Sequence, residues 1–567
     1  MNDWREQLRM IKRALAEREQ LHSKIDTHRQ REQDISSAKA RLHTDVSRSG
    51  QQDTKIRQVT EKVPSIAQLS PTRSESRQQK GLSFGLPPKP KTGDRILNIG
   101  IDYGTSTTKV CIRESLGEME DVKTFPVNLD DSNPGTGQLL YPSVVVIDSG
   151  RLYFGTEAQR RNSSKAVTLP YLKVCLACEA EGGGEPLATC RSIRAQGTGR
   201  CTGSFPYALK GEHNSFKASD AVVLFLAWVM GHARRRVPEA LVGRSSVGFT
   251  YNLGVPVDQF DPTSPLRNAY QKVAYFAWLL SDGVTQGILL EQALDWLSKI
   301  KNLEPPPPEK SMIHLCPETG ASIASCVLSP ETPSGLYGLI DIGAWTTDIS
   351  FFELSQGTAV GVPMIAFYSA GTHRIAVNDI DERTFRSIFD LWDLGEVPRD
   401  FGSSGVISAT MLRQQREQGT FGKVEFLIEN FKRKPSLATL QFARDCVAER
   451  VLYRIRKTLV EASSKDKRQS QWEGFRIYVI GGGLQERTLW GRVPEEIPVV
   501  GDVGSLPLPR SLHGLPKNLY SRFSVAYGLA FPLALWPANI SPSDTVTRPL
   551  PPKRPFRESA DLGYDEK

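Results

Sequence analysis

The chain contains 567 residues, of which 39% are hydrophobic and 24% are charged. This is an ordinary globular mix, with enough material for two to four domains and a sizeable core. The net charge of +8 is uneven, because residues 1–94 hold 19 Lys and Arg against 12 Asp and Glu, whereas the rest holds 52 against 51. The N-terminus lacks the apolar stretch of a signal peptide. The longest apolar run, from Ala221 to Met230, has about half the length of a membrane span, so we expect a soluble, cytoplasmic protein with no membrane role.

The N-terminal arm is polar and carries one amphipathic pattern. Four apolar residues within residues 1–45 follow helical 4-3-4 spacing: Trp4, Leu8, Ile11 and Leu15. The spacing predicts a short amphipathic helix, a candidate for weak coiled-coil pairing or for docking on an unidentified protein partner or client. Residues 46–94 are rich in Ser, Gln, Lys and Pro and predict a flexible linker. Trp4 and Phe84 are the only Phe, Trp or Tyr residues among the positive charges of residues 1–94, and so few aromatic residues argue against nucleic acid as a partner.

Residues 95–537 read as an alternation of strands and helices, which predicts α/β architecture. The expected strand pairs are RILNIGIDYG with TTKVCIRE, LLYPSVVVID with RLYFG, and the two halves of GLYGLIDIGAWTTDISFFEL; SVGFTYNLGVPV and FRIYVIGGG are single strands. The expected helices run from Asp220 to Arg236, from about Asn268 to Leu280 and from Leu440 to Ala462. Two similar Asp-x-Gly hairpins lie more than 200 residues apart. They predict a duplicated core with one hairpin in each of two lobes, residues 95–340 and 341–537.

Each hairpin places an aspartate at the end of an apolar strand, followed by a glycine and small hydroxyl residues. The first reads Asp102-Tyr103-Gly104-Thr105-Ser106-Thr107-Thr108-Lys109, and the second reads Asp341-Ile342-Gly343-Ala344-Trp345-Thr346-Thr347-Asp348. A turn of this kind exposes successive backbone N–H groups, which suit phosphate oxygens. The aspartate would repel phosphate directly but suits hydrated Mg²⁺, held through water.

A third element follows the strand IYVI, where Gly481, Gly482 and Gly483 would let the backbone approach a flat ligand such as adenosine. Each element alone is common, because an Asp-x-Gly turn is most often a plain hairpin and a glycine triplet is often a bare loop. Together and in this order they favour ATP or ADP, bound with Mg²⁺ in a cleft between two lobes. No GxxxxGK[ST] segment occurs, which disfavours a P-loop enzyme.

This order of segments resembles the superfamily of actin, sugar kinases and heat-shock ATPases, and most of all the nucleotide-binding domain of the 70-kDa heat-shock chaperones. The segments that carry the resemblance are NIGIDYGTSTTKV, YPSVVVID with LYFGTEA, ALKGEHNSFKASDAVVLFLAW, PETGASIAS and SVAYGLAF. The resemblance covers about residues 95–537 and implies a two-lobed, actin-like ATPase fold with a duplicated ribonuclease H-like core. The family continues into a peptide-binding domain, whereas residues 538–567 read as a disordered Pro-rich tail, so we expect an atypical member that lacks it.

The resemblance also implies roles for single residues. Asp102 and Asp341 would hold Mg²⁺ through water, and Glu318 would position the attacking water. The other matching positions would contact phosphates (Gly104, Thr105, Ser106, Gly343, Ala344, Trp345), assist hydrolysis (Thr346, Asp348), pack on adenosine (Gly481, Gly482, Gly483) or lie in the matching Gly371-Thr372-His373 segment (Gly371).

Some positions depart from the family pattern. The family carries a phosphate-reaching lysine after LYFG, where this chain has Gln159 or Arg160. Trp345 stands where the family has a glycine, the glycine pair expected after His373 is absent, and Arg522 lies near the place of an aspartate that precedes the closing helix. We therefore expect ATP binding to be retained and hydrolysis to be slow.

Four cysteines cluster in a Gly-rich insert at about residues 170–205: Cys175, Cys178, Cys190 and Cys201. Four thiolates contributed by loops would suit a structural zinc ion, and a CxxC pair in a cytosolic protein is more often metal-binding or redox-active than disulfide-bonded. The second half of the cluster lacks a CxxC pair, so unpaired loop cysteines stay an equal alternative.

Three functions stay open at this point. The leading one is a chaperone-like, weak ATPase whose nucleotide state is coupled to partner binding. The alternatives are an actin-like, filament-forming ATPase and a small-molecule kinase of the same superfamily. The KGE segment, Glu318 and the closing helix favour the first, and no clear motif supplies the substrate-side aspartate that a kinase needs.

Overall fold

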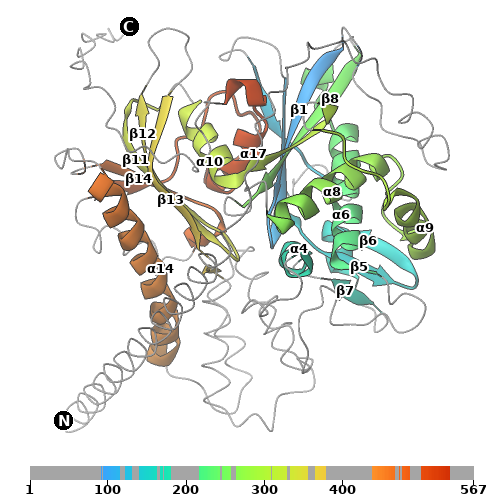
Figure 1. Cartoon of the computed structure of the whole chain (residues 1–567), viewed down its shortest axis with the longest axis horizontal. Coiled ribbons are helices and arrows are strands. Elements are labelled where there is room, and N and C mark those ends of the chain that lie inside the picture. Colours follow the sequence, from blue (N-terminus) through green and yellow to red (C-terminus); the bar gives the residue numbers. More distant parts are fainter. Residues whose placement is uncertain are drawn as a thin grey trace, which may run out of the picture. The chain divides into compact units, whose positions relative to one another are not determined.

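The computed structural model describes residues 91, 94–114, 122–129, 139–161, 166–169, 172–180, 216–242, 246–256, 264–307, 310–328, 332–355, 364–373, 375–377, 437–465, 472, 475–485 and 500–536. All the described residues belong to one compact unit, Lys80–Lys567 (Figure 1). The expected N-terminal helix, nearly all of the expected linker and the expected C-terminal tail lie outside these residues.

The first sheet has the strand order β10-β8-β1-β2-β3, with β4 paired to β2. Its strands are β1 (Arg95–Tyr103), β2 (Thr107–Glu114), β3 (Thr124–Pro126), β4 (Tyr141–Pro142), β8 (Val247–Val255) and β10 (Ile313–Pro317). β1 is antiparallel to β2 and parallel to β8, which is parallel to β10. A central strand with two covered faces needs a continuous apolar run, and β1 is buried from Leu97 to Tyr103.

Three helices share a hydrophobic core with this sheet: α4 (Leu172–Ala180), α6 (Ala218–Arg235) and α8 (Pro265–Leu280). The expected helices in the regions of α6 and α8 are thereby confirmed.

A small third sheet, in the order β7-β5-β6-β9, contains the second expected strand pair. Its strands are β5 (Val145–Asp148), β6 (Arg151–Phe154), β7 (Val167–Leu169) and β9 (Ile288–Leu289). Helix α3 (Gly155–Arg160) directly follows β6, helix α9 (Leu290–Ile300) directly follows β9, and the short helix α7 (Glu239–Val242) precedes β8 of the first sheet.

The second large sheet has the order β13-β12-β11-β14-β15. Its strands are β11 (Gly335–Ile342), β12 (Thr347–Ser355), β13 (Met364–His373), β14 (Phe475–Ile480) and β15 (Val500–Gly504). β11 is antiparallel to β12 and parallel to β14, β12 is antiparallel to β13, and β14 is parallel to β15. These directions match those of β1 with β2 and β8, of β2 with β3, and of β8 with β10. The two large sheets therefore repeat one order and one set of directions over five strands.

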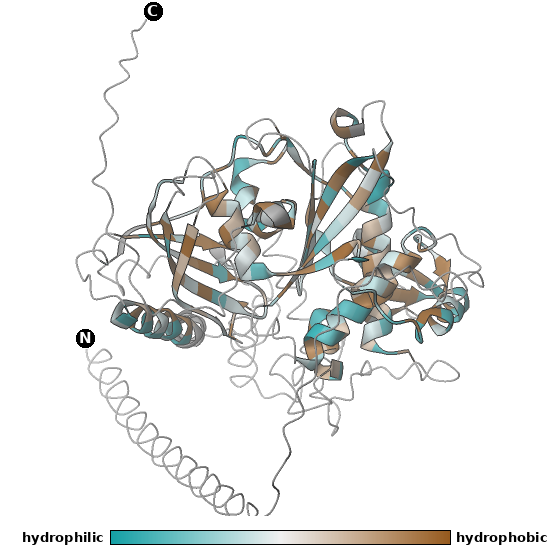
Figure 2. Cartoon of the chain, turned by 45° about the horizontal axis from the view of Figure 1, so that its top comes forward, coloured by the Kyte–Doolittle hydropathy of each residue, from teal (hydrophilic) through white to brown (hydrophobic). Residues whose placement is uncertain are grey.

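The long helix α14 (Leu437–Lys465) packs on the second sheet, as expected for the run from Leu440 to Ala462. Val451, Leu452, Ile455 and Leu459 fall on one helical stripe and share a core with Ile477 of β14. Figure 2 shows hydrophilic and hydrophobic residues around this helix, as a helix with one buried stripe requires.

Two further helices, α10 (Glu318–Val327) and α17 (Tyr520–Leu529), lie between the two large sheets (Figure 1). They share a core with residues of both sheets, including Cys111 of β2 and Phe352 of β12. A Cβ atom at Gly528 would lie 1.8 Å from the Ala321 carbonyl oxygen, so α10 and α17 cross in backbone contact. Short 3₁₀ turns cover Gly482–Gln485, Lys517–Leu519 and Leu533–Leu535.

Two buried asparagines of the first sheet fix the end of α17. The side chain of Asn98 donates to the Ala530 carbonyl at 3.2 Å, and that of Asn252 donates to the Leu529 and Phe531 carbonyls at 2.7 and 2.9 Å. Carbonyls at a helix C-terminus have no partner within the helix. The two amides satisfy this need and couple α17 to β1 and β8.

Candidate functional site

The turns of the two predicted hairpins line one cleft, the first between β1 and β2 and the second between β11 and β12. The cleft has an empty volume of about 890 Å³, which includes space open to solvent. Its walls are formed by Asp102, Gly104, Thr105, Ser106, Thr107, Lys109, Lys173, Glu318, Asp341, Gly343, Ala344, Trp345, Thr346, Asp348, Val377, Gly481, Gly482, Ser521, Arg522 and Val525. Residues from α4, α10, α17 and both large sheets thus meet at one place.

Every residue predicted from the sequence to bind nucleotide or Mg²⁺ or to assist hydrolysis lines this cleft, except Gly371 and Gly483. Gly371 pairs with Ile349 within the sheet, on β13. Gly483 is packed against Ile342, where a Cβ atom would lie 2.4 Å from a side-chain carbon. Gly483 therefore has a packing role in this structure.

Side chains outside the first turn form hydrogen bonds with it and with the strands that it joins. Ser143 Oγ donates to the Gly104 carbonyl at 2.7 Å, and it lies 2.9 Å from Thr108 Oγ1. The Lys109 ammonium donates to the Asp102 carboxylate at 2.9 Å. The Ser106 hydroxyl is buried and has no hydrogen-bond partner among the described groups. A buried hydroxyl without a partner is costly, so a polar ligand atom at this turn would stabilise it.

Glu318 opens α10 directly after β10 and forms an ion pair with Lys173 of α4, with 2.5 Å between Oε1 and Nζ. Both side chains are buried. Burial raises the pKa of Glu318, against the attraction of the Lys173 ammonium. Burial alone would lower the pKa of Lys173, but the charges of Glu318 and Asp102 outweigh it, so that this pKa is raised. Lys173 therefore carries its positive charge within the cleft.

The second hairpin places two more carboxylates in the cleft, from Asp341 and Asp348. Burial raises the pKa of Asp341 to about 7, and the negative charge of Asp102 acts in the same direction. The Thr372 hydroxyl donates to Asp348. The Gly343 amide donates to the Thr346 carbonyl at 2.9 Å and closes the turn.

Within the glycine triplet, Gly481 has a left-handed backbone conformation that favours glycine. Its φ is +86°, and a Cβ atom would lie 2.3 Å from Asp341 Oδ1. Its amide donates to the Ser521 carbonyl of α17 at 3.0 Å. The glycine therefore brings β11, β14 and α17 together at one end of the cleft.

Three positively charged residues that line the cleft were not predicted as site residues from the sequence: Lys109, Lys173 and Arg522. Arg522 was noted only as a departure from the family pattern. Gln159 and Arg160, the positions expected to stand in for a phosphate-facing lysine, are exposed on α3 and do not line the cleft. The signal for Lys173 was present, because it is the one charged residue in the apolar run from Leu172 to Cys178, and a buried lysine needs a partner.

Two of the four clustered cysteines have a different setting from the one expected. Cys175 and Cys178 lie on helix α4 and are buried in the first hydrophobic core, whereas loops were expected. Cys190 and Cys201 lie outside the described residues. No group of three or more His, Cys, Asp or Glu side chains is arranged to hold a metal ion in the described part of the chain, and the zinc site stays a prediction.

A scan against models of protein families matches no part of the chain, and a search of curated proteins finds no match. None of the helices in the described ranges is both long and apolar enough to cross a membrane. The residues that line the cleft are therefore the basis for a proposal about function.

Proposed function

We propose that the cleft binds ATP with Mg²⁺ and hydrolyses it slowly, and that the nucleotide state is coupled to the binding of a protein partner. The observation that carries this proposal is the convergence of two Asp-x-Gly turns, Glu318 and the Gly481–Gly482 backbone on one cleft. Four carboxylates and three cations line it, a balance suited to a polyphosphate together with a divalent cation.

The repeated strand order of the two large sheets supports a two-lobed, actin-like fold built on a duplicated core. In such a fold one hairpin turn would belong to each lobe, in equivalent positions after β1 and β11. On this basis we infer kinship with the 70-kDa heat-shock chaperones, in line with the sequence motifs. The lobes would be residues 95–340 and 341–537.

The residues present fit the nucleotide. The partnerless Ser106 hydroxyl and the backbone of both turns would hold phosphates, with Lys109 and Lys173 as counter-charges. The backbone of Gly481 and Gly482, which lines the cleft beside Ser521 and Arg522, would pack on adenosine. Asp102 and Asp341 would hold Mg²⁺ through water, and a bound Mg²⁺ would neutralise phosphate charge.

Glu318 is the residue proposed to orient the attacking water. Lys173 fixes the position of its carboxylate through the buried ion pair. Because the same lysine would also attract phosphate, the two attractions compete, which is consistent with slow turnover. Phosphoryl transfer needs little beyond such positioning and charge neutralisation.

Thermal unfolding of the full chain tests the binding. Mg-ATP at 100 times its Kd should stabilise the protein by about 2.7 kcal/mol, because it binds only the folded state. Asp102→Asn should weaken this shift, whereas Asp295→Asn should preserve it, because Asp295 pairs with Lys299 on the exposed face of α9. An unchanged melting curve and no heat of binding at millimolar ATP would refute the proposal.

Turnover needs its own test. Glu318→Gln should retain ATP binding and lower the rate of phosphate release, since the amide keeps the shape of the side chain and loses its charge. A variant that binds ATP and hydrolyses it at the wild-type rate would remove Glu318 from the mechanism.

Partner binding is tested by truncation. Deletion of residues 1–90 should preserve ATP binding and abolish partner capture if the N-terminal helix is the docking element.

A further inference from the structure

Trp345 is the bulkiest residue of the turn between β11 and β12, and it lies among the small residues of that turn. Its neighbours Gly343, Ala344 and Thr346 all line the cleft, as Trp345 itself does. The tryptophan is only 5% exposed. A turn of small residues offers little apolar surface, so the indole must be covered by another part of the molecule.

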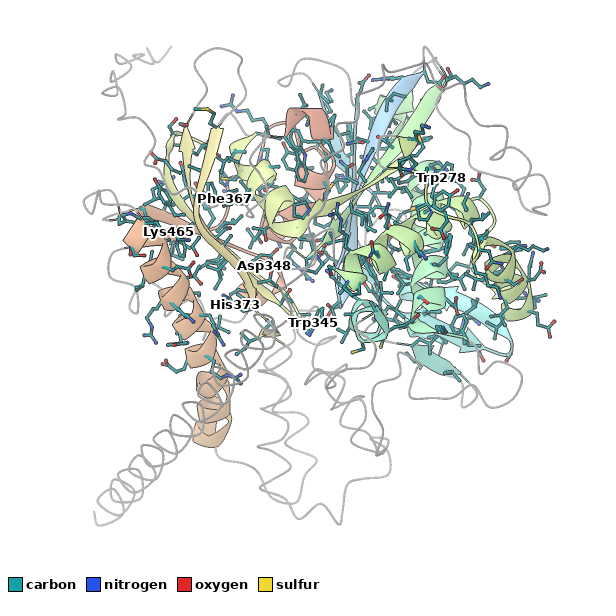
Figure 3. All side chains as sticks on the ribbon, viewed as in Figure 1. Trp278, Trp345, Asp348, Phe367, His373 and Lys465 are labelled. Atoms are coloured by element: carbon teal, nitrogen blue, oxygen red, sulfur yellow. The ribbon has the colours of Figure 1, made fainter. Side chains whose placement is uncertain are left out.

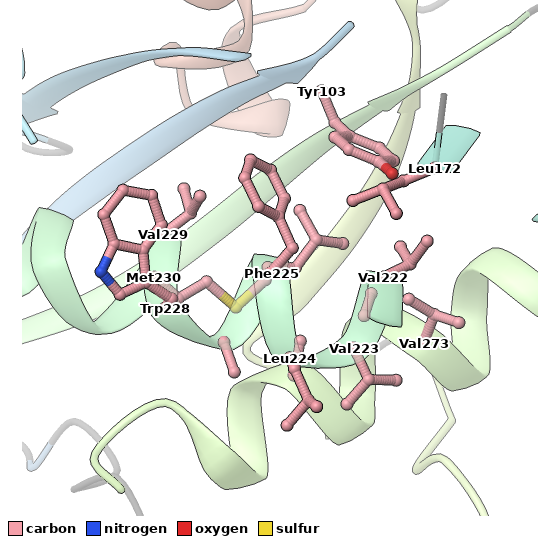
Figure 4. Packing of buried hydrophobic residues seen from close by; sticks show 14 of the residues in the cluster. Tyr103, Leu172, Val222, Val223, Leu224, Phe225, Trp228, Val229, Met230 and Val273 are labelled. Atoms are coloured by element: carbon pink, nitrogen blue, oxygen red, sulfur yellow. The ribbon is translucent and has the colours of Figure 1, made fainter. Parts of the chain in front are cut away.

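That cover comes from the far side of the cleft. Trp345 belongs to the hydrophobic core of the first sheet and of helices α4, α6 and α8. Figure 4 shows part of this core, with Leu172 of α4 beside Tyr103 of β1 and Phe225 of α6. Within the described residues, Trp345 is the one member of this core that follows Leu315 in the sequence.

The strands on either side of Trp345 pack elsewhere. Ile340 and Ile349 belong to the core beneath α14, and Phe352 belongs to the core around α10 and α17. The indole therefore leaves its own sheet and crosses to the opposite wall. Figure 3 shows it at the end of the second sheet, next to α4.

We propose that Trp345 is a clasp that holds the β11–β12 turn against the wall formed by α4 and so keeps the cleft closed. The effect of the clasp on nucleotide rests on the proposed function, because the clasp would regulate the entry and exit of ATP at the same site. The wall carries Lys173 and the turn carries Asp341 and Asp348. Release of the indole would therefore separate Lys173 from Asp341 and Asp348.

The burial of one large aromatic side chain biases an opening equilibrium by roughly tenfold to a hundredfold. An opening step that precedes both entry and exit slows both rates by the same factor. Loss of the clasp should therefore accelerate both the association and the dissociation of ATP. A tryptophan that only contacts nucleotide would change dissociation alone, and one that only blocks the site would change association alone.

The experiment compares Trp345→Ala and Trp345→Phe with Trp278→Phe in the full chain. Trp278 is a matched control, because it is 7% exposed in the same core, on α8, and does not line the cleft. Stopped-flow fluorescence with a labelled ATP would give both rate constants. Hydrogen exchange without nucleotide would follow the amides of residues 172–180.

We expect Trp345→Ala to raise both rate constants, and the exchange of residues 172–180, by roughly tenfold to a hundredfold. Trp345→Phe should give a smaller rise in each, and Trp278→Phe should match the wild type. Unchanged exchange at residues 172–180 in Trp345→Ala would overturn the clasp, and so would a change in only one of the two rate constants. If the wild type binds no ATP, the proposed function is refuted. The hydrogen-exchange measurement, which needs no nucleotide, still tests whether Trp345 holds the turn against α4.

Discussion

Lys173→Met should destabilise the protein more than Glu318→Gln, although both changes break the same ion pair. The two side chains are 5% and 10% exposed, and Lys173 Nζ lies 2.5 Å from Glu318 Oε1. Removal of one member of a buried pair leaves an uncompensated charge and costs about 3–5 kcal/mol of unfolding free energy. The surroundings of the remaining charge decide where in that range each variant falls.

The surroundings of the pair are acidic, and this makes the two variants unequal. With Lys173 removed, the Glu318 carboxylate stays beside Asp102, whose charge repels it. With Glu318 removed, the Lys173 ammonium keeps the attraction of Asp102. We therefore expect about 4–5 kcal/mol for Lys173→Met and about 3 kcal/mol for Glu318→Gln. The double variant should cost less than the sum, with a coupling of about 2–3 kcal/mol.

The cost of Lys173→Met should also depend on pH. Burial already raises the pKa of Glu318, and loss of the lysine removes the main opposing influence. The folded variant thus binds a proton more tightly than the unfolded chain does, so its stability falls as the pH rises through the raised pKa. Urea unfolding followed by tryptophan fluorescence at pH 6 and pH 8, without nucleotide, measures this. Additive losses, or an equal loss for Lys173→Met at both pH values, would refute the reasoning.

Four further outcomes follow from the charges of the cleft and from the packing of its glycines and helices. Because the pKa of Asp341 is raised to about 7, Mg-ATP should bind about tenfold more weakly at pH 6 than at pH 8, and Asp341→Asn should remove this pH dependence in calorimetric titrations. Stability of the protein without nucleotide should fall as the pH rises from about 4 to 7, since the folded state holds the proton of Asp341 more tightly than the unfolded chain does. Gly481→Ala should abolish the ATP-induced thermal shift, because its Cβ atom would lie 2.3 Å from Asp341 Oδ1, whereas Gly504→Ala, with nothing within 4 Å, should retain it. Gly528→Ala should lower the melting temperature of the protein without nucleotide by several degrees, because its Cβ atom would lie 1.8 Å from the Ala321 carbonyl oxygen; an unchanged melting temperature would mean that α10 and α17 separate at little cost.

The hairpins could be predicted from the sequence because their pairing is local. In β1 and β2, Asp102 opposes Lys109 across a short turn, and both apolar strands and the glycine lie within about twenty residues. The same holds for β11 and β12. In both hairpins the apolar pattern and the glycine turn predict the same antiparallel pair of strands. Most of the candidate site residues lie in these turns and were therefore predicted together with them.

Lys173 shows why the rest could not be predicted. Its helix lies at the edge of a Gly- and Cys-rich stretch, so the local signals favoured a loop. Its partner Glu318 is 145 residues away in sequence, and no periodicity connects the two. The clasp at Trp345 is of the same kind, because the apolar surface that covers it belongs to helices encoded far earlier in the chain.

The link between Asn98 and the carbonyl of Ala530 has a consequence for biosynthesis. The two residues are 432 positions apart. A ribosome adds about 5–20 residues per second, so β1 waits roughly 20–90 seconds after its own emergence for the helix that completes its hydrogen bonding. During that time the face of β1 at Gly100, which later touches the backbone of α17, has no native cover. The nascent chain must therefore protect this face until α17 has been synthesised, and slowing translation between β1 and α17 should increase aggregation of the unfinished chain.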